Sequence, residues 1–308
     1  TVRSFPFNRI GERAGGVVLC AGVVLLVYVA AWMVLAASFR AHQYLGFFAS
    51  VALAYFTLSA RALGDAARAV LACLNAGDDA GSRSCLSMVV GRDTAGLSRS
   101  EVVRAVVETV AENTSDGIVA PLFYLALGGP ALGMAYKAVN TLDSMVGYKN
   151  ERYRDMGWAS ARCDDAANYL PARLTGLLLV AAAVITRRDG RGAFAVMRSA
   201  ARKHASPNSG YPEAAMAGAL GVQLGGPSAY HGVLRHAALL GEVKGFVSVL
   251  SQLAVLAGVL LDGDYSRVTL AIRELTAHTA LESLSKSAAA FGLAPALPPL
   301  AATGVDTA

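Results

Sequence analysis

Near the amino end of the sequence, 21 consecutive residues carry no charge (Val17–Ala37, VVLCAGVVLLVYVAAWMVLAA). A helix of this length crosses the roughly 30 Å hydrocarbon core of a bilayer. It also exceeds the 7–15 apolar residues that are typical of a signal peptide. A shorter apolar segment, Tyr44–Ala60, follows after six residues, SFRAHQ. We therefore expect a transmembrane hairpin over residues 1–60, with a cytoplasmic amino end because three arginines precede the first helix.

The composition agrees with a membrane protein. Of the 308 residues, 55% are hydrophobic and 16% are charged, whereas soluble proteins average about 45–50% apolar and about 25% charged residues. The net charge is +5, but basic residues are spread along the connecting segments, which argues against nucleic-acid binding. None of the four cysteines forms a C-x-x-C pair, so neither a disulfide framework nor a zinc site is expected.

Four further apolar stretches are candidates for the membrane: Ile118–Tyr136, Leu174–Ile185, Ala214–Leu234 and Gly245–Leu261. The first is interrupted by glycine and proline, which predicts a broken or re-entrant segment. The second lies between Arg173 and Arg187, and it is too short to span unless those arginines snorkel. The third is rich in glycine and weaker, whereas the fourth has the length of a last span. We expect residues 292–308 to form a loose tail.

These segments predict one all-α membrane domain over residues 1–308. It would be polytopic, with about 4–5 membrane-embedded helical segments, some broken or re-entrant. Residues 61–117 would form cytoplasmic amphipathic helices, and residues 118–234 a polar active-site region. Within 61–117, one helix should end near Gly77, and Ser98 with Glu101 resembles a capping box that opens the next helix.

That next helix runs into a polar stretch, ENTSDG, at Glu112–Gly117. Its acidic residues Glu108, Glu112 and Asp116 recur at steps of four, so they would share one face if the helix lasts that far. The stretch also contains residues that cap helices and form turns, such as Asn113. The sequence leaves both interpretations open: an acidic wall of a site, or a solvated helix end.

A second polar group follows Ile118–Tyr136. It comprises Lys137, Asn140, Asp143, Ser144, Lys149 and Arg152. Carboxylate and amide oxygens suit Mg²⁺, which keeps several waters and bridges phosphates, while lysine and arginine bind phosphate groups. Snorkelling at the membrane surface would explain the cations, but it would not explain Asn140 and Asp143.

A third polar group lies in RCDDAANYLPAR. Asp164 and Asp165 precede Asn168 by about one helical turn, with arginines on both sides. This pattern suits a second metal–phosphate contact, and ordinary salt bridges are the alternative.

The fourth group lies in RKHASPNSGYPE. Lys203 and His204 lead into a turn shaped by proline and glycine, which presents Asn208 and Glu213. A histidine exchanges protons near neutral pH, although such turns also serve as plain loops. No G-x-x-x-x-G-K-[ST] or G-x-G-x-x-G motif is present, so any ATP site must be built from these scattered residues.

Three stretches carry a resemblance to a known family: VETVAENTSDGIVAPLFY, AYKAVNTLDSMVGYKNERYRDMGWASARCDDAANYLPARLT and ARKHASPNSGYPEAAMAGALGVQLGGP. The chain resembles the CobD/CbiB family, membrane-bound adenosylcobinamide-phosphate synthases of cobalamin biosynthesis. The resemblance is dense from about residue 101 to residue 227. The family usually begins with a further apolar segment that carries a GDP…HPV-type stretch. The sequence starts at Thr1 without it, so we expect a truncated amino end.

The resemblance implies an ATP-dependent and Mg²⁺-dependent ligase. It would join the carboxylate of adenosylcobyric acid to the amine of (R)-1-amino-2-propanol or its O-phosphate. It also implies a multi-pass protein of the cell membrane whose active site faces the cytoplasm. A second copy of the chain or other membrane enzymes of the corrinoid pathway are the expected protein partners, beside membrane lipid.

Side-chain chemistry suggests a role for each candidate residue at these positions. We expect three carboxylates to hold Mg²⁺ and phosphate: Asp143, Asp164 and Asp165. Four cations would bind phosphate groups: Lys137, Lys149, Arg152 and Lys203. One of three groups would act as the base: Glu112, His204 or Glu213. Four amides would orient substrates: Asn113, Asn140, Asn168 and Asn208.

Two other classes of protein compete with this interpretation. A Mg²⁺-dependent membrane transferase of the prenyl type would act on a diphosphate, but Gly147 and Asn168 stand where further acids would be expected. A transporter or a sensor would not be an enzyme. Transporters typically show inverted repeats, and the sequence contains no evident repeat.

Overall fold

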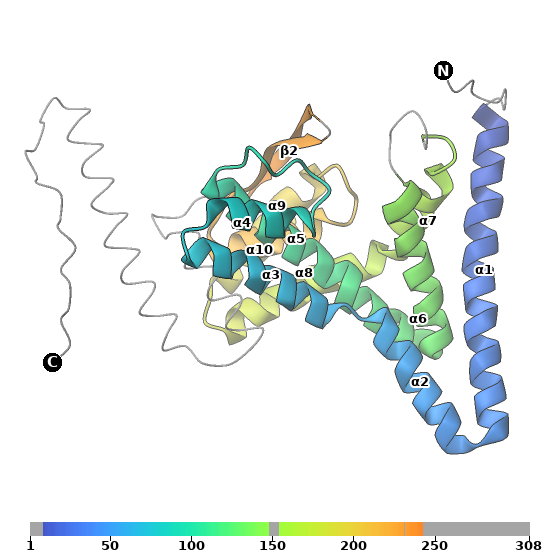
Figure 1. The fold of residues 1–308 in the computed structure, drawn as a ribbon. Coiled ribbons are helices and arrows are strands. Elements are labelled where there is room, and N and C mark those ends of the chain that lie inside the picture. Colours follow the sequence, from blue (N-terminus) through green and yellow to red (C-terminus); the bar gives the residue numbers. More distant parts are fainter. Residues whose placement is uncertain (1–8, 148–153, 231, 243–308) are drawn as a thin grey trace, which may run out of the picture.

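The computed structural model describes residues 9–147, 154–230 and 232–242. The expected last span Gly245–Leu261, the expected tail 292–308, and Lys149 and Arg152 lie outside these residues. The described chain is almost entirely helical, in agreement with the predicted all-α class (Figure 1). Its helices are α1 Arg9–Ala41, α2 Gln43–Thr57, α3 Ala60–Asn75, α4 Asp79–Ser87, α5 Arg99–Thr114, α6 Ala120–Val146, α7 Trp158–Ala167, α8 Tyr169–Ile185, α9 Gly190–Ala200 and α10 Gly210–Leu220.

Helices α1 and α2 form the predicted hairpin. The connection SFRAHQ is mostly helical, because α1 continues to Ala41 and only His42 separates the two helices. The extended backbone of His42 breaks the helix, and its ring accepts a hydrogen bond from the Tyr44 N–H group at 3.3 Å. Large apolar side chains point outward from both helices: Leu26 is 67% exposed and Phe48 is 66% exposed. Such a continuous apolar surface is typical of contact with lipid.

Helix α6 is broken, as the glycines and prolines of its sequence predict. Gly128 and Gly129 leave the helical conformation, and Gly129 has a φ of +69°, which a residue with a side chain rarely adopts. Pro130 follows, and because it has no backbone N–H group it cannot donate a helical hydrogen bond to the preceding turn. In Figure 1 the chain descends from α5 to this break and then climbs back beside α1. Residues 120–146 therefore bend at Gly128 and Gly129 rather than run straight.

By length and composition, three helical stretches of the described chain could cross a membrane: Gly11–Ala41, Gln43–Asn75 and Arg99–Val146. Helices α7 and α8 would form a fourth span together, although they meet at an angle of 46°. The Leu174–Ile185 segment lies in α8, so its continuity with α7 supplies the length that the sequence alone lacked. The structure thus supports a polytopic membrane protein.

The amino end of α1 is fastened to the segment that leads into α7. Arg13 Nε donates to Asp155 Oδ1 at 2.8 Å, and the guanidinium lies 5.6 Å from the centre of the Trp158 ring. Gly16 permits the close approach, because a Cβ atom there would lie 2.1 Å from the carbonyl oxygen of Met156.

The main hydrophobic core lies away from α1 and α2. Helix α5 supplies a buried valine-rich face, and it packs with α3, α4 and α10. The chain enters α5 through the predicted capping box, in which the Ser98 and Glu101 side chains bond each other's backbone N–H groups. Gly77, with a φ of +74°, follows the end of α3 as expected.

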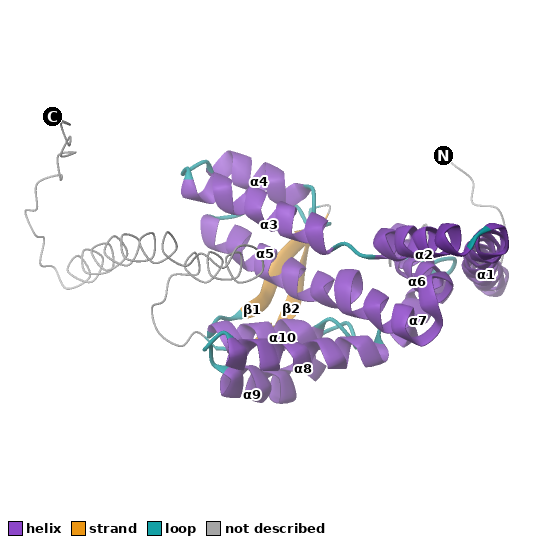
Figure 2. Cartoon of the chain, turned by 90° about the horizontal axis from the view of Figure 1, so that it is seen from below, coloured by secondary structure: helices purple, strands orange, loops and turns teal. Residues whose placement is uncertain are grey.

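The expectation that Ala214–Leu234 enters the membrane as a weak span is wrong. Its first part is α10, in which Ala214, Ala215 and Ala217 are completely buried against neighbouring helices. Its second part enters an antiparallel β-hairpin, β1 Leu224–Tyr230 and β2 Val233–Leu240. In Figure 2 the hairpin lies between α5 and α10. The α10 part of the segment is therefore apolar because it packs inside the protein, a property that composition cannot distinguish from contact with lipid.

Candidate active site

Polar side chains from four parts of the chain meet beside the broken α6. They come from the end of α5, the second half of α6, the junction of α7 with α8, and the turn over residues 204–209. Between α5 and α6 the helix widens into a π-helical turn, Ser115–Val119. The helix therefore does not end at Glu112–Gly117, so the interpretation of this stretch as a cap or terminal turn is wrong. Turns of this kind within α-helices occur frequently at functional sites.

The three acids on the α5 face have different surroundings, so the stripe is not a solvated face. Glu108 is 5% exposed and bonded to arginine. Glu112 is exposed and lies next to the 204–209 turn, whereas Asp116 is half-buried in the π-helical turn. Asn113 donates to the Thr109 carbonyl at 2.9 Å, which leaves only part of its amide for a substrate.

Asp164 is held by amides from two helices. Asn168 Nδ2 donates to its Oδ2 atom at 3.0 Å, and Asn140 Nδ2 approaches its Oδ1 atom at 3.4 Å. Asn168 is only 1% exposed, so we expect it to orient the Asp164 carboxylate rather than to touch a substrate. The Tyr136 hydroxyl donates to Asn168 Oδ1 at 2.8 Å, and its ring stacks on Tyr124 at 4.9 Å. A buried network thus fixes this carboxylate before any ligand arrives.

The predicted metal ligands gather, but they do not form a closed cage. Asp143 interacts electrostatically with Asp164 and Asp165, and Asp116 with Asp164 and Asp143. Within residues 9–147, 154–230 and 232–242, no group of three or more His, Cys, Asp or Glu side chains could hold a metal ion by itself. Magnesium is commonly held by one or two carboxylates together with water and substrate phosphates. The donor set therefore fits a Mg²⁺ ion that a phosphate shares.

The turn over residues 204–209 ties α5 to α7. Ser209 Oγ donates to Glu112 Oε1 at 2.9 Å. Asn208, only 5% exposed, donates to the Asp165 carbonyl at 2.8 Å. The Ser206 hydroxyl accepts from the Asn208 and Ser209 N–H groups, both at 3.2 Å, which fixes the shape of the turn. The turn therefore orients Glu112 and closes one side of the site.

His204 and Glu213 lie behind this turn. The Ser206 N–H group donates to His204 Nδ1 at 3.0 Å, and His204 Nε2 lies 3.8 Å from Glu213 Oε1. Glu213 is 6% exposed. Burial, followed by the negative charges of Glu112 and Glu108, raises the pKa of Glu213 well above its usual range. Because Glu213 is buried whereas Glu112 is exposed, a substrate amine reaches Glu112 more readily.

The predicted phosphate-binding cations do not all converge. Lys137 lies on α6 with its Nζ atom 3.5 Å from Ser59 Oγ, at the break between α2 and α3. Lys203 instead lines a separate cavity of about 150 Å³ together with Glu242. Arg173 lies against the rings of Tyr169 and Tyr211 and approaches Asn208. The sequence had suggested no role for this arginine in the site.

Sequence reasoning also missed a buried ionic cluster that supports the site. Arg92 lies 2.7 Å from Glu108, and Arg104 lies 3.8 Å from it. Glu108 also accepts from the Gly225 N–H group at 2.7 Å, which fastens β1 to α5. The spacing of Arg104 and Glu108 by four residues on one helix was the only local signal, because Arg92 and Gly225 come from distant parts of the sequence.

Comparison with known proteins identifies the family. The sequence model described as CobD/Cbib protein matches residues 2–281. The cobalamin biosynthesis protein CobD of Geobacter metallireducens is 55% identical over 72% of this chain and 70% of its own length. CobD of Klebsiella pneumoniae is 54% identical over 75% and 72%, and CbiB of Salmonella typhi is 51% identical over 77% and 74%. No solved structure matches. The chain belongs to the CobD/Cbib protein family.

Proposed function

We propose that the chain is an enzyme of cobalamin biosynthesis that forms an amide bond. It would join the carboxylate of adenosylcobyric acid to (R)-1-amino-2-propanol or its O-phosphate at the expense of ATP. The names of the relatives support the pathway. The observation that carries the reaction is the gathering of Asp143, Asp164 and Asp165 near Glu112, with the amides of Asn140 and Asn168 on Asp164.

A carboxylate needs activation before an amine can displace its oxygen. In the proposed reaction, the substrate carboxylate takes a phosphoryl group from ATP to give an acyl phosphate. The amine then attacks the acyl carbon, the C–N bond forms, and phosphate leaves with the former carboxylate oxygen. The protein must neutralise charge on the transferred phosphoryl group and accept one proton from the attacking nitrogen.

The carboxylates and Lys137 would together neutralise the charge on the transferred phosphoryl group. Asp143, Asp164 and Asp165 would hold Mg²⁺, which neutralises phosphate charge when it is bound. Asp164 is the best fixed of them, because Asn168 and Asn140 hold its two oxygens. Lys137 would contact phosphate directly as a point charge.

Glu112 would accept the proton from the amine. Its side chain is exposed, and Ser209 orients it from across the site. Glu213 is less accessible because it is only 6% exposed, and His204 faces Glu213 rather than the carboxylates. We further propose that the site faces the cytoplasm, because lysines and arginines are abundant along residues 137–173.

The test is conversion of adenosylcobyric acid by the purified, detergent-solubilised chain. Aminopropanol and its phosphate are offered separately with ATP and Mg²⁺, and the product is identified by mass. We expect an amide with one of the two amines, formed only with ATP. Absence of any ATP-dependent amide from folded protein that still binds the corrinoid would contradict the proposed reaction.

Two variants test the role of the site. Asp143→Ala should abolish amide formation and leave the protein in the membrane fraction. Asp65→Ala is the matched control, since it removes an exposed aspartate that pairs with Arg61 on α3, outside the site. Normal turnover by Asp143→Ala, or equal loss in both variants, would refute the assignment of Asp143.

A further inference from the structure

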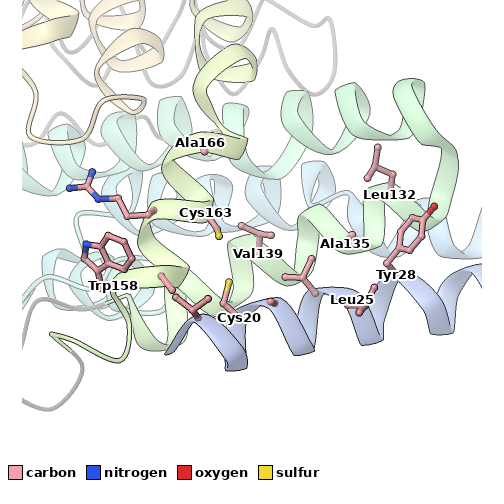
Figure 3. A pocket seen from close by; sticks show the side chains of 14 residues that line it. Cys20, Leu25, Tyr28, Leu132, Ala135, Val139, Trp158, Cys163 and Ala166 are labelled. Carbon is pink, nitrogen blue, oxygen red and sulfur yellow. The ribbon is translucent and has the colours of Figure 1, made fainter. Parts of the chain in front are cut away.

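A long apolar groove lies between α1, α6 and α7, separate from the polar site. Figure 3 shows its walls, and its volume is about 680 Å³. Helix α1 contributes residues from Val17 to Tyr28, and α6 contributes residues from Leu132 to Val139. Trp158 of α7 lies toward one end, whereas Tyr28 lies toward the other. Arg162 also lines the groove, about one helical turn along α7 from Trp158.

The length of the groove matches one leaflet of a bilayer. Val17 and Tyr28 are eleven residues apart on α1, which corresponds to ~16 Å along a helix. Half of the hydrocarbon core is ~15 Å thick. The α1 wall belongs to the candidate span Gly11–Ala41, and Leu25 on that wall is 63% exposed. The groove therefore lies where acyl chains are the surrounding solvent.

One end of the groove carries positive charge. The Arg162 side chain is 66% exposed, and its only ion pair in the described part of the chain is with Asp165 at 3.5 Å on the same helix. An exposed pair at this distance holds the guanidinium weakly. Arg13 lies over the outer face of Trp158, 5.6 Å from the ring centre. Tryptophan and arginine are the residues that typically mark the headgroup level.

We propose that this groove binds an anionic phospholipid, with an acyl chain along α1 and α6 and the phosphate against Arg162. An apolar trough of one-leaflet length that ends at a cation complements such a lipid in both shape and charge. A zwitterionic lipid would gain less from Arg162, and a helix of a second copy would bury the trough without using that charge. The bound lipid would brace α7, the helix that carries Asp164 and Asp165.

Tryptophan fluorescence tests this site directly. The chain has two tryptophans, Trp32 and Trp158, so Trp32→Phe leaves only the one in the groove. The full-length purified variant is titrated in mixed micelles with phosphatidylglycerol or phosphatidylcholine brominated on the acyl chains. We expect brominated phosphatidylglycerol to quench Trp158 at the lower mole fraction. Unlabelled phosphatidylglycerol should reverse the quenching.

Substitutions at the cationic end separate charge from packing. In the Trp32→Phe background, Arg162→Gln should raise the half-quenching mole fraction of phosphatidylglycerol about fivefold, which corresponds to ~1 kcal/mol. Arg162→Lys should keep the preference. Equal quenching by the two lipids without any substitution at Arg162 would overturn the proposal.

Filling the groove provides a second, independent readout. Ala21 lines the groove, whereas the exposed Ala30 of the same helix does not. Ala21→Phe should remove the saturable quenching, and Ala30→Phe should preserve it. Identical quenching curves for these two variants would overturn the proposal. A second result would also overturn it: Ala21→Phe breaks up a dimer, and quenching in the parent chain does not depend on the lipid headgroup. That result would assign the groove to a second copy of the chain.

Discussion

Replacing Glu108 with alanine tests whether the buried ionic cluster holds the β-hairpin against α5. The side chains of Glu108 and Arg92 are 7% and 13% exposed, and they lie 2.7 Å apart. Removing the carboxylate leaves a buried guanidinium without its partner and frees the Gly225 N–H group. Breaking a buried pair in this way costs about 3–5 kcal/mol.

The expected change in melting temperature is large enough to measure. At 2–4 °C per kcal/mol for a protein of this size class, the loss corresponds to roughly 6–20 °C in Tm. Detergent-solubilised protein is heated, and the monodisperse fraction is followed by size-exclusion chromatography. Far-ultraviolet circular dichroism at the starting temperature confirms that the variant has folded.

Asp65→Ala is the control for this experiment. Asp65 pairs with Arg61 and Arg68, but it is 54% exposed and its partners are 90% and 45% exposed. Exposed pairs contribute about 0–1 kcal/mol, so we expect a change below about 4 °C. If Glu108→Ala lowers the Tm no more than Asp65→Ala does, the cluster does not fasten the hairpin and the reasoning is refuted.

Three further predictions concern other parts of the chain. Because the pKa of Glu213 is raised in the folded state, its contribution to stability is lost as the pH rises from the ordinary carboxylate value of about 4.3 through the raised value. The Tm of Glu213→Gln should therefore rise relative to the Tm of the parent chain as the pH increases over that interval. A difference in Tm that is the same at all pH values would contradict this. Asn168→Ala should lower the rate of amide formation more than tenfold, because it frees the Asp164 carboxylate. The affinity for the corrinoid should stay within about twofold of the parent chain's. An unchanged rate of amide formation would exclude this positioning role. Gly16→Val should loosen α1 from Met156 and raise the rate of proteolysis near residue 156. A rate of proteolysis equal to that of the parent chain would contradict this.

Local signals predicted much of the helical framework. The capping box at Ser98 and the stop at Gly77 depend on residues a few positions apart, and both occur as expected. The break in α6 likewise follows from Gly129 and Pro130, whose backbone preferences do not depend on distant contacts.

Longer-range features could not be predicted in the same way. The Ala214–Leu234 segment is equally apolar whether lipid or protein covers it, and only packing against α5 and α9 decides in favour of protein. Tyr136 was read as the last residue of an apolar stretch. Its hydrogen bond to Asn168 joins residues 32 positions apart, and no periodic pattern marks such a contact.

The sequence by itself indicated that this chain is helical and contains membrane segments, because Val17–Ala37 is uncharged and long enough to cross a bilayer. It also determined which polar residues are candidates for chemistry, through side-chain type and the family resemblance. The tertiary structure decided which of them act together. It brought Glu112, Asp143 and Asp164 near one another, turned Asn168 inward to hold a carboxylate, and set Lys203 beside another cavity. The physical reason is that helix periodicity fixes neighbours within one or two turns, whereas a site assembled from four elements depends on how their apolar faces pack.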